Sequence, residues 1–386
     1  MDTYSRVMTR LMGTNDAYLI DYVHRVTAHI NHHLATGDID ARFTDALARC
    51  IDTATSAYLE KKENAAMALR VYLAYLNART KGGLTLRNFH THDFRIVFFE
   101  EGHRYVLLTP NPEHGTYEVK RNTKAKDGTP SDLMSVTRLK EELFEKFDED
   151  AQIDRMMSNT KYWNNPKANK KYYGMTKQQI KDLWEKIRTD ASREGTAAHL
   201  NAENYCNGFA YDATTPEFKW LLEYEKVYVT GKMVPYRTEW MIHDRTLKLT
   251  GSIDIIYKYL LPDGTPRPRD ADGKLHVKMV DWKRSGNIRE ESYRDKNGKP
   301  TYGNKPCTST VESCTFNGFC IQMMLYQYLL ETNYDVIVDE MAVVGFHPLN
   351  PKYLPVERNR PLIEGIIQYR REIVAKREED AMMTIL

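Results

Sequence analysis

The segment 277–283, Val-Lys-Met-Val-Asp-Trp-Lys, places an acid and a lysine two positions apart at the end of an apolar run. The pattern predicts a strand. Because side chains alternate along a strand, Asp281 and Lys283 are expected on one face and Trp282 on the other. A carboxylate can hold a divalent cation, and a neighbouring lysine can orient an attacking water or help to deprotonate it. The pair therefore suits metal-assisted hydrolysis of a phosphodiester.

A second acid in a neighbouring apolar run strengthens this interpretation. An acid two positions before a lysine also begins at Glu60, Glu118 and Asp272, so the triplet alone says little. The segment 250–256, Thr-Gly-Ser-Ile-Asp-Ile-Ile, buries Asp254 where a carboxylate is costly unless it is paired or binds metal. Two acids on adjacent strands can share a hard cation. The alternative is a buried structural ion pair between Asp254 and Lys283. Gly251 is expected to allow a close approach by another backbone or the substrate.

Two further pairs of polar residues lie one helical turn apart. His199 and Glu203 are expected on one face of a long helix. His199 is a candidate metal ligand, although a single histidine on a helix more often has a structural role. Gln322 and Tyr326 have the same spacing, and they either frame a site or line the core with a polar tip.

Hydrophobic periodicity predicts the elements that would position these residues. Residues 1–85 are expected to form a helical module that ends in a Thr-Lys-Gly-Gly linker, and a hairpin turned at Glu101–Gly102 should follow. The remaining order predicts one α/β domain over 86–386, with a mixed central sheet flanked by helices. The expected helices are 136–157, 177–205 (opened by a capping box of Thr176 and Gln179), 216–229, 317–331 and 360–379, and the expected strands are 236–242, 248–259, 275–283 and 336–346.

The polar residues form an ordered set over roughly 135–346. It reads G-T-x-x-H, an acid-bearing strand, G-x-x-D, D-x-K and Q-x-x-x-Y. This order resembles the RecB-like and lambda-exonuclease-like branch of the PD-(D/E)XK nucleases, and Ile253 stands where many members have proline, as is common in this branch. The stretches 135–138, 146–148 and 173–176, with Trp184, also resemble exonucleases of large DNA viruses. The residues that carry the main match are Gly195, Thr196, His199, Glu239, Gly251, Asp254, Asp281, Lys283, Gln322 and Tyr326.

The resemblance implies a restriction-endonuclease-like core and a role for each matched residue. It implies a Mg²⁺ or Mn²⁺ site held by His199, Asp254, Asp281 and the backbone carbonyl of Trp282. Glu239 would be an additional acid that helps to bind a second ion. Lys283 would position the water, while Gln322 and Tyr326 would frame the site. The activity implied is that of a DNA exonuclease in recombination, replication or repair.

Several residues are candidates for contacts with DNA. Six lysines and no acid lie between 161 and 181, interleaved with four aromatic residues, which suits phosphate contacts and base stacking or, alternatively, a solvated basic face. The loop 283–305 carries seven basic residues against three acids. By resemblance, a 5′-phosphate pocket would use Ser135, Thr137 and Arg138 near a helix start, where an N-cap without ligand is the alternative. Arg193 and Ser285 are further phosphate candidates.

Composition sets the remaining expectations. The 386 residues carry a net charge of +2, so overall charge does not indicate nucleic acid binding. The N-terminus lacks an apolar signal segment, and no apolar run is long enough to span a bilayer, which predicts an intracellular protein, cytoplasmic or nuclear, or in the host cytoplasm if viral. The five scattered cysteines favour reduced thiols over an iron–sulfur cluster. A homo-oligomer or a partner protein bound through residues 1–85 stays open. The alternative functions are an endonuclease of the same superfamily and a non-catalytic DNA-binding protein.

Overall fold

The computed structural model describes Leu84, Asn88, His90 and residues 92–93, 96–99, 104–111, 116–119, 133–295 and 297–383. The helical module expected over residues 1–85 lies outside these residues, apart from Leu84, and stays a prediction. Within the described part, no helix has both the length and the apolar character needed to cross a membrane.

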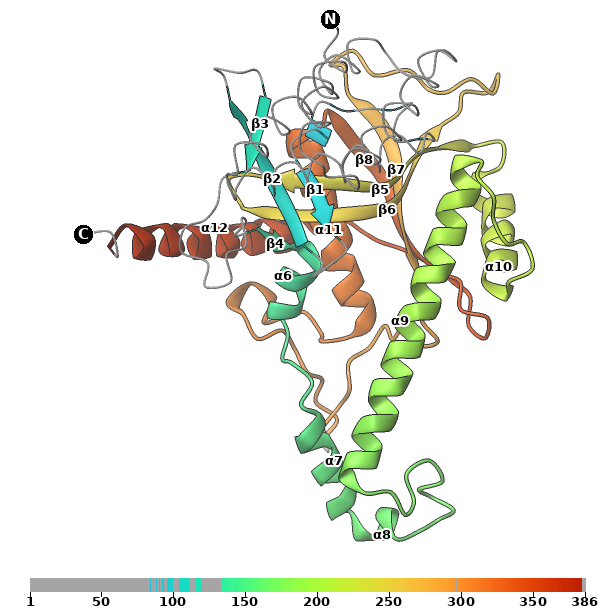
Figure 1. Ribbon diagram of the computed structural model, residues 1–386, viewed down its shortest axis with the longest axis vertical. Coiled ribbons are helices and arrows are strands. Elements are labelled where there is room, and N and C mark those ends of the chain that lie inside the picture. Colours follow the sequence, from blue (N-terminus) through green and yellow to red (C-terminus); the bar gives the residue numbers. More distant parts are fainter. Residues whose placement is uncertain are drawn as a thin grey trace, which may run out of the picture.

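A mixed six-stranded sheet forms the centre of the fold (Figure 1). The strand order is β4-β6-β7-β8-β9, and β5 pairs with β6. Both β5 and β7 are antiparallel to β6, whereas β8 is parallel to β7. The predicted α/β class is therefore confirmed. The strands are β4 Met134–Ser135, β5 Met233–Asp244, β6 Leu249–Tyr259, β7 Leu275–Lys283, β8 Val336–Gly345 and β9 Lys352–Pro355.

One edge of β6 changes partner partway along the strand. Because β5 pairs with β6 from Leu249 to Tyr259, β4 and β7 must share the opposite edge. β4 pairs there with residues 249–250 and β7 with residues 255–258. In the described sheet, residues 251–254 have no ladder partner on this edge. β4 and β7 thus diverge beside Gly251 and Asp254, and we call this place the fork.

Helices cover both faces of the sheet and form two cores. One core contains Leu139 of α6, Leu325 of α11 and Ile366 of α12, packed on apolar strand residues. The other contains Phe218 of α10 together with Tyr257 and Trp282 of the sheet. The helices are α6 Val136–Glu142, α7 Glu149–Ser158, α8 Thr160–Trp163, α9 Lys177–Asn207, α10 Pro216–Tyr224 (continued by the π-helical turn η2 Glu225–Val229), α11 Thr315–Asn333 and α12 Arg360–Met383, with a short 3-10 turn η3 Pro306–Thr308.

The single helix predicted over 136–157 was wrong. The structure has two helices, α6 and α7, separated by residues 143–148. Asp148 begins α7, because its side chain accepts a hydrogen bond from the Ala151 N–H at 2.9 Å. The capping box predicted at Thr176 and Gln179 is present and opens α9. The other predicted helices and strands from residue 177 onward are found with small shifts at their ends.

The predicted hairpin before the sheet is also present. β1 Ile96–Phe99 pairs antiparallel with β2 Arg104–Asn111, and β3 Thr116–Val119 adds a third strand that periodicity did not predict. This small sheet contacts β5 through β1 and brings Tyr105 of β2 close to the fork.

Candidate metal centre and active site

Two carboxylates face each other on β5 and β6. Thr238 pairs with Ile255 and Trp240 with Ile253, so Glu239 lies opposite Asp254. Glu239 has a φ of 44°, in the left-handed region that non-glycine residues rarely adopt. Its Oε2 accepts a hydrogen bond from the Ser252 hydroxyl at 2.9 Å. The local backbone thus turns the Glu239 side chain to the same place as Asp254.

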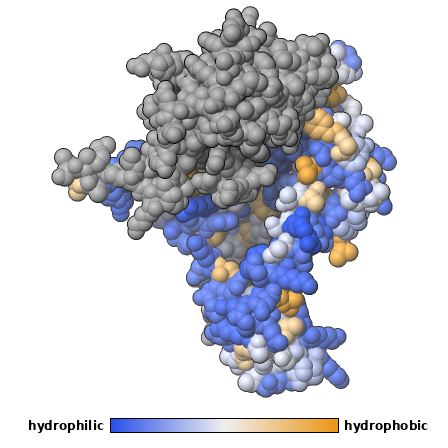
Figure 2. Space-filling model, in the orientation of Figure 1, coloured by the Kyte–Doolittle hydropathy of each residue, from blue (hydrophilic) through white to orange (hydrophobic). Residues whose placement is uncertain are grey.

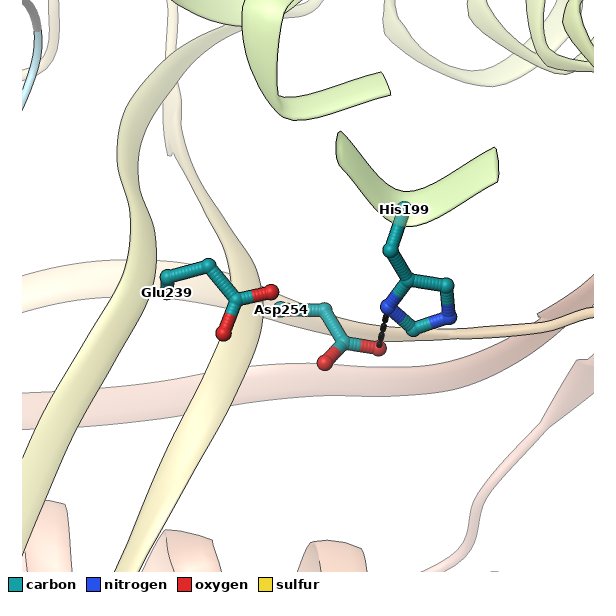
Figure 3. Close-up of side chains that lie close together, drawn as sticks. All are labelled: His199, Glu239 and Asp254. Carbon is teal, nitrogen blue, oxygen red and sulfur yellow. Dashed lines mark ion pairs between the residues drawn. The ribbon is translucent and has the colours of Figure 1, made fainter. Parts of the chain in front are cut away.

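His199 of α9 completes a group of three candidate metal ligands (Figure 3). One ligand atom from each of His199, Glu239 and Asp254 lies within 4.8 Å of the other two. His199 Nδ1 is 3.8 Å from Asp254 Oδ2. Within the residues that the structure describes, this is the one group of three or more such side chains with metal-binding spacing.

Asp281 and Lys283 lie on one face of β7, as predicted. Lys283 Nζ is 2.6 Å from Asp281 Oδ2, and the Asp281 side chain is 2% exposed. The lysine therefore pairs with Asp281 and not with Asp254, which removes the alternative of a structural Asp254–Lys283 pair. Asp281 is not part of the three-residue ligand group, which contains Glu239 instead, and the role of Asp281 as a metal ligand stays a prediction.

A hydrogen-bonded chain holds Asp281 from α11. Gln322 Nε2 donates to Asp281 Oδ1 and to the Tyr326 hydroxyl, each at 3.3 Å. Gln322 Oε1 accepts from Lys140 Nζ of α6, also at 3.3 Å. Because Lys140 can only donate, it fixes which end of the Gln322 amide faces Asp281. Gln322 and Tyr326 thus frame the site, and Lys140 is a member that motif reasoning missed.

Gly251 is required by a neighbouring ring. A Cβ at this position would lie 2.4 Å from Tyr326 Cε1, which is too close for any side chain. The close approach at Gly251 is therefore made by the Tyr326 ring, and not by another backbone as predicted. The motif glycine and the motif tyrosine form one packing unit at the fork.

Trp282 joins the ligand group to the second core. Its backbone N–H donates to Asp254 Oδ2 at 2.7 Å, just beyond Ile255 and Val280, the last pair of the β6–β7 ladder at this end. Its ring meets the His199 ring edge-on, with centroids 6.1 Å apart. Where β6 and β7 diverge, the Asp254 carboxylate thus accepts the hydrogen bond that a backbone carbonyl of β6 would accept in a continuous ladder. The metal-ligand role of the Trp282 carbonyl stays a prediction.

Two acids of the site, Glu239 and Asp281, resist ionisation because they are buried. Burial raises the pKa of Glu239 to about 8, and the charges of Asp254 and Glu203 add to the shift. Burial also raises the pKa of Asp281 to about 6, although Lys283 opposes this shift. For Lys283, burial lowers the pKa but the carboxylates of Asp281 and Asp254 outweigh it, so the net shift is upward. Lys283 is therefore an ammonium group at neutral pH.

These features fit a divalent cation. Two carboxylates and one imidazole are donors that Mg²⁺ and Mn²⁺ accept, with oxygen as the main ligand type. A cation would oppose the effect of burial and of the neighbouring acids on the pKa of Glu239, because it offers the opposite charge to desolvated carboxylates. The group His199, Glu239 and Asp254 can thus hold a metal ion.

The proposed phosphate residues line a pocket of about 380 Å³ beside the fork. Ser135 Oγ accepts from the Arg138 N–H at 3.1 Å and so acts as the N-cap of α6. Arg138 Nε lies 3.5 Å from Glu142 of the next turn. The two basic and two acidic side chains of the lining balance each other, so the pocket has no excess of positive charge. The full lining is Tyr105, Ser135, Thr137, Arg138, Glu141, Glu142, Lys146, Gly251 and Tyr326.

Arg193 and Ser285 are not brought into this pocket. Arg193 is exposed on α9 and pairs with Asp190 at 3.0 Å. Ser285 accepts from the Asn287 N–H in the loop after β7. Their neighbour Arg284 instead ties that loop to α9 and α10 through Glu194 and Glu217, each at 2.7 Å. The phosphate roles of Arg193 and Ser285 stay predictions.

The cysteines of the described region form no metal site. Cys206, Cys307, Cys314 and Cys320 are free thiols, and no three of them come close enough to share an ion. Cys50 lies outside the described residues.

No protein-family model matches the chain, and no curated protein matches it.

Glu239→Gln is expected to stabilise the metal-free protein at high pH and to abolish its stabilisation by Mn²⁺. Because the folded-state pKa of Glu239 is raised from 4.5 to about 8, the metal-free protein loses unfolding free energy as pH rises through this range. At pH 8.5 the metal-free variant should therefore melt above the wild type, at roughly 2–4 °C per kcal/mol gained. Mn²⁺ should raise the Tm of the wild type at pH 8.5, less at pH 6, and should not raise that of the variant. Scanning calorimetry with and without Mn²⁺ measures each effect.

Glu225→Gln provides a matched control. Glu225 is a buried acid whose pKa is also raised by burial, but it bonds Tyr257 and lies outside the ligand group. This variant should keep the full response to Mn²⁺. An equal Mn²⁺-induced rise in Tm in Glu239→Gln would contradict the assignment of Glu239 as a ligand.

Proposed function

We propose that the chain is a Mg²⁺- or Mn²⁺-dependent deoxyribonuclease of the PD-(D/E)XK kind, acting as an exonuclease on the ends of linear double-stranded DNA. The observation that carries this proposal is the convergence of His199, Glu239 and Asp254 beside the Asp281–Lys283 pair. The ordered motif set supports the nuclease class, and its resemblance to lambda-type exonucleases supports exonuclease action in recombination, replication or repair.

In the proposed hydrolysis, each residue of the site has a different role. A bound divalent ion supplies charge neutralisation at the phosphate and a water of lowered pKa. Lys283, held by Asp281 at 2.6 Å, donates hydrogen bonds that orient the attacking water against the phosphorus. Gln322 keeps Asp281 in place from the buried side, so that Lys283 projects from a fixed anchor. Lys283 is the direct contact with the reacting groups, and Gln322 acts through Asp281.

Lys283→Ala and Asp281→Asn are expected to abolish most DNA cleavage. Loss of the oriented ammonium should lower the rate by about 10²-fold or more, the usual range for a group that positions or transfers protons in the transition state. Digestion of a 5′-phosphorylated linear duplex with Mg²⁺ measures this effect. Lys258→Ala, at a lysine of β6 outside the site, is the control and should keep full activity.

The form of the substrate separates the classes of nuclease. A covalently closed circle should resist digestion, and end-labelled linear DNA should lose nucleotides from its ends. Cleavage of the circle at the linear rate would favour an endonuclease. Robust digestion by both Lys283→Ala and Asp281→Asn would place the active site elsewhere.

A further inference from the structure

A helical arm projects from the catalytic sheet (Figure 1). α9 leaves the site at His199, and α7 and α8 pack near its other end. At about 1.5 Å per residue, its axis runs roughly 33 Å from Lys177 to His199. The far end of the arm therefore lies about one helical turn of B-form DNA, or about 10 base pairs, from the ligand group.

The arm is held together by its own ion pairs and core. Lys177 lies 2.9 Å from Asp150 and 2.7 Å from Asp154, and Lys181 lies 2.8 Å from Asp150. Ile153 of α7 and Ile180 of α9 are fully buried. Two of the six lysines noted in the sequence are therefore structural.

The other four lysines lie in the segment 159–176, which contains no acid. All four are exposed, and none forms an ion pair with a residue of the described part of the chain. The segment is nevertheless ordered, because the buried Asn169 accepts from the Tyr172 N–H and donates to the Trp163 carbonyl. Figure 2 shows this end of the molecule as a mostly hydrophilic surface. The four are Lys161, Lys167, Lys170 and Lys171.

We propose that these four lysines, the arm lysines, bind the phosphates of duplex DNA about one turn away from the bond that is cleaved. The inference rests on the proposed function. The arm holds these lysines at a fixed distance from the ligand group, so a ligand that contacts both must be stiff over that distance. Duplex DNA meets this condition, because its persistence length is about 150 base pairs. Four exposed ammonium groups on an ordered scaffold complement the phosphate charge. The loop after β7 contacts the end of α6, where the chain leaves toward α7, because the Asn304 N–H donates to the Leu143 carbonyl.

Replacement of all four arm lysines by glutamine is expected to weaken binding of long duplexes selectively. Fluorescence anisotropy with blunt duplexes of about 8 and 24 base pairs, in Ca²⁺ instead of Mg²⁺, measures the affinities. On the longer duplex the variant should bind at least about tenfold more weakly, and the slope of log K against log salt should fall by about 3–4, as for the loss of four phosphate contacts. On the short duplex the two proteins should agree.

A second fourfold variant is the control for charge alone. Lys219, Lys226, Lys232 and Lys376 are exposed on other parts of the chain, and their replacement should leave both affinities near the wild-type values. Equal affinity of the arm variant and the wild type for the long duplex, or an equal loss on both lengths, would overturn the arm proposal while DNA cleavage stands. A wild-type chain that binds no duplex would overturn it together with the proposed function.

A different observation concerns the strained ligand Glu239. A non-glycine residue at positive φ is strained, and such a conformation persists where its surroundings impose it. The residues two before and one after Glu239 along β5 are held from outside the strand. Arg237 Nη1 donates to Asp93 Oδ2 at 2.7 Å, and Trp240 Nε1 donates to Asp93 Oδ1 at 3.0 Å.

Further contacts fix the same stretch of β5. Asn207 of α9 accepts from the Leu84 N–H at 2.8 Å and donates to the Thr238 hydroxyl at 2.9 Å. Asn88 donates to the Tyr236 carbonyl at 2.7 Å. Residues on both sides of Glu239 are thus attached to Leu84, Asn88 and Asp93, which we call the brace.

We infer that the brace positions Glu239 for metal binding, so that Asp93 is a positioning residue of the ligand group. The inference depends on the proposed metal site and not on DNA cleavage. Asp93 fixes residues two before and one after Glu239, and Asn207 joins this stretch to the helix that carries His199. Residues that precede the sheet in the chain thereby fix the position of Glu239, a candidate metal ligand within the sheet.

Asp93→Ala is expected to lower the affinity for Mn²⁺ by about 10-fold or more, the usual effect of losing a residue that orients a ligand. Asp93→Asn keeps an acceptor for Trp240 and should lose less. Titration calorimetry with Mn²⁺ measures the affinity, and urea unfolding without metal measures the stability. Val338→Ala, in the core of β8, should lose stability but keep the affinity.

Wild-type affinity in Asp93→Ala, or an equal loss in Val338→Ala, would overturn the role of the brace. Absence of Mn²⁺ binding in the wild type would overturn it as well. Mn²⁺ binding without DNA cleavage would contradict the nuclease proposal and leave the brace standing.

Discussion

The repulsion among desolvated carboxylates is the constraint on which the site depends. Beyond the effect of burial, the charges of Asp254 and Glu203 raise the pKa of Glu239, and the charge of Asp254 raises the pKa of Asp281. The lysines of the site are Lys140 and Lys283. Four acids against two ammonium groups leave an excess of two negative charges when all are ionised. Without metal, the raised pKa of Glu239 shows that a proton relieves part of this excess. A divalent ion would balance this excess, so the charges of the site suit a metal ion.

The fork supplies the space and the geometry for this charge. A continuous β6–β7 ladder would fill the edge beside residues 251–254 with backbone hydrogen bonds. Because β7 diverges, the Trp282 N–H bonds the Asp254 carboxylate instead, and Asp281 is free to meet Lys283 and Gln322. Tyr326 fills the remaining gap against Gly251. The motif residues are therefore the ones that a break in the sheet exposes to each other.

Much of this could be predicted from local pattern. Strong periodicity gave β6, β7 and α11, and the alternation of side chains placed Asp281 and Lys283 together. The closeness of Glu239, rather than Asp281, to His199 and Asp254 could not be predicted, because it depends on a left-handed residue within β5 and on which acid pairs with the lysine. Lys140 and Tyr105 come from elements distant in sequence, and no local spacing marks them. The roles expected for residues 1–85 lie outside the described residues.

The Asp93–Arg237 pair is difficult to explain by stability alone. Both side chains are at least 96% buried, and a buried ion pair is often no more stabilising than apolar residues of the same size. The pair differs from apolar contacts because its geometry is directional. The Arg237 guanidinium donates hydrogen bonds from a planar fork and also stacks on Trp240, with 4.4 Å between Cζ and the ring centroid. Such a pair fixes the backbone on both sides of Glu239 more tightly than apolar contacts would. A ligand in a strained conformation needs that precision, since a small backbone shift would move its carboxylate away from Asp254 and His199.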